Sequence, residues 1–178
     1  SLYYAELGIS NALSKRITAS KLEISKEKIE KAIDKTQEKY DIQYDASQKE
    51  AIHRIMTEPL FVLTGRPGTG KTTIINAVID VYVQLNELDN DEEIEEAIVL
   101  AAPTGRAAKR MNELTGYRAS TIHRLLGIAI DSVDDSFEDK EINGEFLIID
   151  EMSMVDTWLM NRVFKASPEG LKILLVGD

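Results

Sequence analysis

The fold of this chain is decided by the stretch Gly65-Arg66-Pro67-Gly68-Thr69-Gly70-Lys71-Thr72. An apolar run over 60–63 enters this stretch and a helical pattern over 74–79 leaves it, so it joins a strand to a helix. A glycine-rich turn of this kind aims backbone N–H groups at a phosphate, and the helix N-terminus adds its partial positive charge. Lys71 supplies a cation and Thr72 a hydroxyl ligand for Mg²⁺. The sequence therefore predicts a phosphate-binding loop for a nucleoside triphosphate.

The 178-residue chain is 43% hydrophobic and 29% charged, which suits one compact domain with a small appendage. It contains no cysteine, which excludes disulfides and thiolate metal sites. No apolar run approaches the ~20 residues of a membrane span, and none has the form of a signal peptide. We therefore expect a cytoplasmic protein with no membrane partner.

The net charge of −10 is unevenly distributed. Residues 87–96 contribute −7 and residues 131–141 contribute −5, so the rest of the chain carries +2. Solvated acidic loops can coexist with a neutral or basic face that meets phosphates. The acidic balance is therefore weak evidence against a nucleic-acid partner.

Apolar runs typical of strands alternate with stretches of helical spacing. The expected strands cover residues 60–64, 97–102, 146–150 and 171–176. The expected helices between them cover residues 70–86, 104–115 and 154–166. This alternation predicts an α/β fold with a parallel sheet between layers of helices. An acidic stretch over 127–145 fits either a loop or a hairpin.

Three helices are expected ahead of the first strand. Apolar spacing predicts helices over residues 3–19 and 25–39, the second capped by Ser25. A third helix begins at Asp45 or Ser47 and closes just before the first strand. The charged residues of the first two helices are most simply a solvated face.

A second chemical signature is the run Phe146-Leu147-Ile148-Ile149-Asp150-Glu151. Ligands of open parallel sheets bind at the carboxyl ends of the strands. Asp150 can therefore reach the magnesium shell, and Glu151 can face the attacking water. Downstream of a phosphate-binding loop, this pattern favours a Walker B element over a strand that merely enters a loop.

Two tracts after the second strand can contact a polymer. Residues 101–110 read Ala-Ala-Pro-Thr-Gly-Arg-Ala-Ala-Lys-Arg, a strand end followed by a basic cluster that can bind a phosphodiester backbone. A solvated helix face is the other interpretation. Residues 119–127 read Ala-Ser-Thr-Ile-His-Arg-Leu-Leu-Gly. Here His123 fits a contact residue or a packed histidine at a helix start.

Taken together, these tracts resemble the ordered helicase motifs of the RecD-like branch of superfamily 1. The resemblance spans residues 45–178 and rests on Gln48 and on residues 65–73, 102–110, 120–127, 147–156 and 174–178. The tracts Ala-Pro-Thr-Gly-Arg-Ala-Ala-Lys-Arg and Thr-Ile-His-Arg-Leu-Leu-Gly are more particular to this branch than the phosphate-binding loop is. Their spacing is more similar to stand-alone RecD-type helicases than to the RecD subunit of RecBCD.

The resemblance implies a RecA-like P-loop NTPase domain whose cofactors are ATP and Mg²⁺. It further implies a helicase that moves 5′-to-3′ on single-stranded DNA and opens duplex ahead of it, in DNA repair or recombination. Single-stranded DNA is then the partner, with RecBC-type subunits as further partners if the protein is not of the stand-alone type.

The motif matches assign roles to individual residues. Gln48 would read the adenine edge. The nucleotide-binding residues would be Gln48, Gly65, Pro67, Gly68, Thr69, Gly70, Lys71, Thr72 and Thr73. Lys71, Asp150 and Glu151 would be catalytic, with Mg²⁺ held by Thr72 and Asp150. The single-strand track would consist of Pro103, Thr104, Arg106, Thr121 and His123. His53 and Trp158 are interpreted as packing residues.

The resemblance also implies a domain division and a limit on activity. Residues 1–44 would be a helical lead-in from a preceding domain, and residues 45–178 the first RecA-like ATPase domain, ending after the start of helicase motif III. The second RecA-like domain of such helicases carries arginine fingers, which are worth about 10³ to 10⁵ in rate. We therefore expect this chain to bind nucleotide and to hydrolyse it very poorly.

One residue departs from the family pattern, and two other classes of function stay open. Arg66 stands where these helicases usually have a second glycine, and it fits either a cation near the phosphates or a side chain in solvent. A nucleotide-gated regulatory module and a P-loop ATPase acting on protein or another polymer are the alternatives. The helicase interpretation predicts salt-sensitive binding of single-stranded DNA, whereas the regulatory interpretation predicts no DNA dependence.

Overall fold

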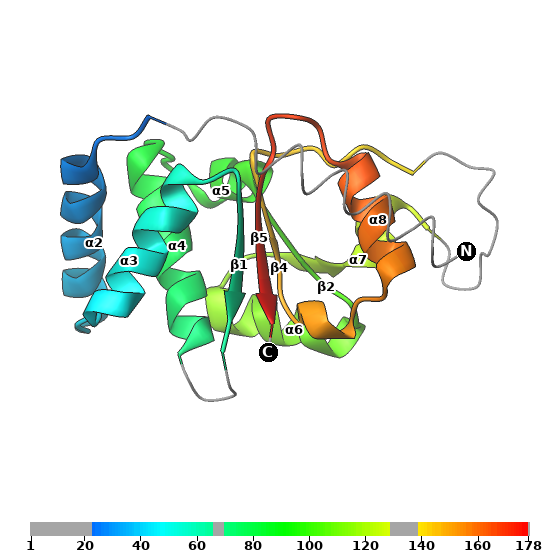
Figure 1. Ribbon diagram of the computed structural model, residues 1–178, viewed down its shortest axis with the longest axis horizontal. Helices are drawn as coiled ribbons and strands as arrows, with labels where there is room; N and C mark the ends of the chain where they lie inside the picture. The colour runs from blue at the N-terminus through cyan, green and yellow to red at the C-terminus, as the bar shows by residue number, and fades with distance from the viewer. Residues whose placement is uncertain (1–22, 66–69, 129–138, 178) are drawn as a thin grey trace.

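The computed structural model describes residues 23–65, 70–128 and 139–177. In Figure 1 these residues form one sheet flanked by helices on both faces. The helix expected over residues 3–19 lies outside the described residues. In the acidic stretch over 127–145, which was expected to be a loop or a hairpin, residues 139–145 are irregular. Residues 129–138 of that stretch also lie outside the described residues.

A parallel sheet with strand order β1-β5-β4-β2-β3 forms the centre of the fold. Its strands are β1 (Leu60–Thr64), β2 (Ile98–Ala102), β3 (Ala119–Thr121), β4 (Phe146–Ile149) and β5 (Lys172–Gly177). Every neighbouring pair is parallel, so all carboxyl ends meet at one edge. The expected α/β fold is confirmed, and β3 is a short strand that the sequence did not indicate.

The helices are α2 (Lys26–Tyr40), α3 (Ala46–Thr57), α4 (Lys71–Leu85), α5 (Asp91–Ala97), α6 (Gly105–Thr115), α7 (Ile122–Leu126), the 3₁₀ turn η1 (Met152–Met154) and α8 (Thr157–Ala166). The expected helices over 25–39, 70–86, 104–115 and 154–166 correspond to α2, α4, α6 and α8. None of the helices in the described ranges is long and apolar enough to cross a membrane.

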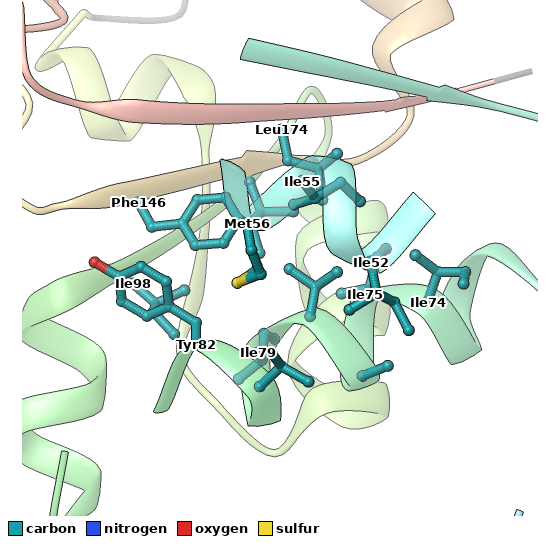
Figure 2. Close-up of a cluster of buried hydrophobic side chains, with 14 of the residues drawn as sticks. Ile52, Ile55, Met56, Ile74, Ile75, Ile79, Tyr82, Ile98, Phe146 and Leu174 are labelled. Carbon is teal, nitrogen blue, oxygen red and sulfur yellow. The ribbon is translucent and has the colours of Figure 1, made fainter. Parts of the chain in front are cut away.

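Two apolar cores cover the two faces of the sheet. Alternate residues of β4 divide between them: Phe146 and Ile148 face the core under α2, α3 and α4, whereas Leu147 and Ile149 face the core under α7 and α8. Figure 2 shows the first core, where side chains of α3 and α4 meet Phe146 and Leu174. Burial on both faces explains why β4 and β5 read as nearly continuous apolar runs.

Helix α5 lies in an acidic segment where the sequence did not predict a helix. The solvated loop expected over residues 87–96 is wrong over 91–96, and the strand expected from residue 97 begins at Ile98. The Asn90 side chain caps the helix by accepting a hydrogen bond from the Glu93 N–H. Acidic side chains in the first turn favour a helix N-terminus, and Ile94 anchors the helix in the core.

The two predicted N-caps differ in the structure. Ser25 occupies the N-cap position of α2, but its side chain makes no capping hydrogen bond. Asp45 forms a full capping box on α3: its carboxylate accepts from the Gln48 N–H at 2.8 Å, and Gln48 Oε1 accepts from the Asp45 N–H at 2.9 Å. The start of α3 is therefore fixed by local hydrogen bonds.

A buried polar cluster joins α2 to α4. The Asp80 carboxylate accepts hydrogen bonds from Thr36 Oγ1 at 2.6 Å, Lys39 Nζ at 2.9 Å and Gln84 Nε2 at 2.9 Å. Asp80 is 9% exposed, and Thr36 is fully buried. The hydrogen bond from Lys39 to Asp80 raises the pKa of Lys39, so this pairing is complete below the ordinary lysine pKa and is lost at more alkaline pH.

Replacing Asp80 with alanine should destabilise the protein by about 2 kcal/mol, because Thr36, Lys39 and Gln84 would each lose a hydrogen bond to a largely buried carboxylate. Urea unfolding measures this change. Asp34→Ala removes an exposed carboxylate from α2 and should cost less than about 0.5 kcal/mol. Equal losses for the two variants would contradict the structural role of Asp80.

Candidate active site

The carboxyl edge of the sheet brings together residues from three separate tracts. The strand register sets Thr64 opposite Gly177, Ile149 opposite Leu175, and Ala102 opposite Thr121. The residues that follow these strands therefore share one edge: Gly65 after β1, Asp150 after β4 and Pro103 after β2. Ligands of open parallel sheets bind at this edge.

The described ends of the phosphate-binding loop have the expected form. Gly70 is the N-cap of α4 and has a φ of 85°, a left-handed conformation that favours glycine. Lys71, Thr72 and Thr73 form the first turn of α4, where backbone N–H groups lack helical acceptors. Arg66, Pro67, Gly68 and Thr69 lie outside the described residues.

The side chain of Lys71 reaches from α4 to the sheet. Its Nζ donates a hydrogen bond to the carbonyl oxygen of Gly177 at 3.3 Å. Gly177 is the last residue of β5, which lies between β1 and β4. The ammonium group therefore lies between the phosphate-binding loop and the strand that ends in the two acids.

The turn after β4 has an unusual backbone. The Asp150 N–H donates to the Ala101 carbonyl at 3.1 Å, and Asp150 Oδ1 accepts from the Glu151 N–H at 2.8 Å. Glu151 has φ 55° and ψ 40°, the left-handed region that non-glycine residues rarely adopt. Strain of this kind persists where the surrounding structure imposes it and is concentrated at functional sites.

Gln48 approaches the phosphate-binding loop from α3. A Cβ atom built on Gly70 would lie 3.4 Å from Gln48 Nε2. The capping box orients the Gln48 amide, since Oε1 accepts from the Asp45 N–H and Nε2 then points toward Gly70. An amide with one donor and one acceptor can pair with the edge of adenine.

The residues present fit a magnesium ion that arrives with nucleotide. Within the described ranges, no group of three His, Asp or Glu side chains could hold a metal by itself. Mg²⁺ at phosphate sites takes few protein ligands and completes its shell with phosphate oxygens and water. The hydroxyl of Thr72 in the first turn of α4 and the carboxylate of Asp150 after β4 are ligands of the required kind.

Two residues of the predicted single-strand track, Thr104 and Thr121, are the N-caps of helices that start at the carboxyl edge. Thr104 caps α6 by accepting from the Ala107 N–H at 3.1 Å, and Thr121 caps α7 by accepting from the Arg124 N–H at 3.2 Å. Sequence reasoning missed both capping roles, although a threonine just before a helix is the usual signal. Arg106 is exposed in the first turn of α6.

The acidic helix α5 and the basic residues of α6 lie at opposite edges of the sheet. At the carboxyl edge, Arg106, Lys109 and Arg110 of α6 are exposed and form no ion pair with other described residues. Helix α5, with its run of acids, precedes β2 and so lies at the opposite edge, as Figure 1 shows. Because the acids of α5 lie at the far edge, the basic residues of α6 are available to phosphates.

Comparison with known proteins places the chain in a family. Residues 48–178 match the family model described as "AAA domain". The chain belongs to this AAA-domain family. It is 39% identical over 134 residues to the ATP-dependent RecD2 DNA helicase of Deinococcus radiodurans, covering 74% of this chain and 17% of that protein. It is 34% identical over 150 residues to the RecBCD enzyme subunit RecD of Mycolicibacterium smegmatis, covering 74% and 26%.

The fold agrees with this membership. The crystal structure of Pif1 helicase from Bacteroides, in complex with ADP-AlF3 and ssDNA, superposes with a TM-score of 0.52 at 26% identity, covering 78% of this chain and 33% of that one. The expected resemblance to RecD-like superfamily 1 helicases is confirmed, and membership implies nucleotide binding. The chain spans well under a third of the length of the two sequence relatives.

Replacing Glu151 with glycine should raise the free energy of unfolding by about 0.5 kcal/mol, because relief of left-handed strain exceeds the added entropy of the unfolded chain. Urea unfolding measures the change. Glu87, at φ 52°, is a matched control far from the site, and Glu87→Gly should give a similar gain. A loss of stability in Glu151→Gly alone would mean that side-chain contacts outweigh the strain.

Proposed function

We propose that this chain is the nucleotide-binding first motor domain of an ATP-dependent helicase that moves 5′-to-3′ on single-stranded DNA. The observation that carries the proposal is the convergence of Gln48, Gly70, Lys71, Asp150 and Glu151 at one edge of the sheet. These residues come from three separate parts of the sequence, and each has the chemistry that its proposed role requires.

Each residue has a separate task in the proposed site. Lys71 and the N–H groups at the start of α4 bind the phosphates, and Gln48 binds the adenine edge. Asp150 and Thr72 hold Mg²⁺, which when bound neutralises charge on the phosphates. Glu151 orients the attacking water, and its left-handed backbone directs the residue away from the line of β4.

DNA is the proposed polymer because basic and capping residues line the same edge. Pro103, Thr104 and Arg106 follow β2. Thr121 is the last residue of the neighbouring strand β3, and His123 follows it in α7. Contacts from such residues go mainly to phosphates and stacked bases, so we expect little sequence preference.

The whole protein has wider proposed properties. We propose that it acts in DNA repair or recombination in the cytoplasm, and that RecBC-type subunits are partners if it is not of the stand-alone type. Residues 1–44 are proposed to be the lead-in to an ATPase domain over 45–178. The Ile29 and Ile33 side chains of α2 nonetheless pack in the same core as α3 and α4. Very weak hydrolysis by this chain alone remains a prediction.

Lys71→Ala should raise the Kd for MgATP at least about tenfold, since a charge-assisted hydrogen bond to phosphate is lost. Calorimetric titration of the 178-residue chain measures this change. Lys165→Ala removes an exposed lysine from α8 and should leave the Kd unchanged. Tight MgATP binding by Lys71→Ala would contradict the nucleotide site.

Arg106→Ala should weaken binding of a short labelled single-stranded oligonucleotide about threefold to tenfold at low salt. It should also reduce the slope of log K against log salt concentration by about 1, because one phosphate contact is lost. Fluorescence anisotropy at two salt concentrations measures both effects.

The matched control is Arg118→Ala, which removes an exposed arginine that pairs with Glu95 of the acidic helix α5. Unchanged DNA binding in Arg106→Ala, or MgATP binding with no salt-sensitive DNA binding, would favour the regulatory or non-DNA alternatives.

A further inference from the structure

The proposed site does not use Lys172, a buried lysine at the amino end of β5. Lys172 is 6% exposed. Its Nζ donates hydrogen bonds to the carbonyl oxygens of Ile55, Met56 and Glu58 at 2.8, 3.1 and 2.7 Å. An ammonium group has three N–H donors, so these three acceptors satisfy it completely. The group therefore has no donor left for a ligand, which indicates a structural contact.

The three carbonyls lie at the C-terminal end of α3. Carbonyls in the last turn of a helix lack intrahelical donors and carry partial negative charge. Lys172 supplies both the donors and the positive charge from a distant part of the sequence. The lysine therefore caps α3 and binds this helix end to the first residue of β5.

Lys172 is charged at neutral pH although its burial disfavours the charge. Burial lowers the pKa of Lys172 to about 8, and the nearby Glu58 carboxylate acts in the opposite direction. The ammonium therefore predominates at neutral pH, with all three donors present. The ring of Phe146, whose centroid lies 6.0 Å from Nζ, also favours the cation.

The remaining contacts of α3 constrain this helix differently. Ile52, Ile55 and Met56 are buried in the core shared with α4 (Figure 2). Apolar packing is non-directional, so it holds the helix against its neighbours more firmly than it fixes position along the axis. Hydrogen bonds at the end of the helix are directional and act along the axis. The C-terminal end of α3 is therefore fixed to the start of β5 by Lys172 together with the short link to β1, where the Pro59 carbonyl accepts from the Ile173 N–H at 3.0 Å.

The other end of α3 carries Gln48, close to Gly70 of the phosphate-binding loop. The 12 residues of α3 form a continuous helix, which at 1.5 Å per residue is about 18 Å long. A helix of this length moves as a rigid unit, so an axial shift at its C-terminal end displaces Gln48 by the same amount.

We propose that Lys172 is a positioning residue for nucleotide recognition, which holds α3 where Gln48 meets the base of a bound adenine nucleotide. This inference rests on the proposed nucleotide site. Lys172 acts through α3, since it lies at the amino edge of the sheet and the site lies at the carboxyl edge. The same strand ends in Gly177, the acceptor of Lys71. Strand β5 thus positions the base side of the site through its first residue and the phosphate side through its last.

The test compares a ligand that has a base with one that has none. Calorimetry with MgATP and with magnesium tripolyphosphate gives two Kd values for the wild type and for Lys172→Met. We expect Lys172→Met to raise the Kd for MgATP about fivefold, the equivalent of about one net hydrogen bond, and to leave the Kd for tripolyphosphate unchanged. Lys49→Met removes an exposed lysine from the same helix and should change neither value.

Two further variants separate positioning from general destabilisation. Lys172→Arg keeps a cation, and a cavity of about 150 Å³ that Lys172 lines gives the larger side chain room. This variant should therefore fold even if Lys172→Met does not. It should show a smaller loss of affinity, confined to MgATP. Val163→Ala destabilises the opposite core and should not alter the ratio of the two Kd values. In a Gln48→Ala background, the effect of Lys172→Met on MgATP should disappear.

Several outcomes would overturn the inference. Equal loss of both ligands in the Lys172 variants, or the same loss of MgATP with and without Gln48, would show that Lys172 does not act through Gln48. If wild-type protein binds tripolyphosphate as tightly as MgATP, the base contributes nothing, and the inference fails while the phosphate site stands. If wild-type protein binds neither ligand, the proposed function itself fails.

Discussion

The insertion of β5 between β1 and β4 is the constraint on which the site depends. Parallel hydrogen bonding sets Thr64 level with Gly177 and Ile149 level with Leu175. The phosphate-binding loop and the two acids are therefore separated by the width of one strand, and the Gly177 carbonyl lies within reach of Lys71. A slip of one residue would exchange the two faces of β5 between the cores, so apolar burial fixes the register as strongly as hydrogen bonding does.

Close packing around Gly177 extends this constraint to the turn after β4. A Cβ atom on Gly177 would lie 3.3 Å from Met152 Cβ and 3.3 Å from the Ser153 nitrogen, so η1 sits directly against the end of β5. Glu151 precedes η1 and has the left-handed backbone. The strand that accepts Lys71 thus also supports the turn that presents the second acid. The Gly177 backbone therefore contacts both Lys71 and the turn that contains the second acid.

Sequence patterns predicted much of this arrangement. The strand expected over 146–150, found over 146–149, shows in the sequence because two-sided burial produces a continuous apolar run. The strand over 60–64 also shows as an apolar run, although Val62 is exposed. The start of α3 shows because Asp45 and Gln48 form a local capping box. Helix α5 was not predicted, since its burial rests on Ile94 and Ala97 within an acidic stretch. Strand β3 was not predicted because a three-residue strand has too few residues to show a period.

The sequence by itself determined which residues have the chemistry that the proposed site requires, and that these residues follow strands of a parallel sheet. Such information is local, because turn glycines, caps and apolar runs act over a few neighbouring residues. Only the tertiary structure decided which strand separates β1 from β4, which carbonyl receives Lys71, and that Lys172 caps α3. These are contacts between residues more than a hundred positions apart, and they depend on strand order and packing, which leave no periodic signal in the chain.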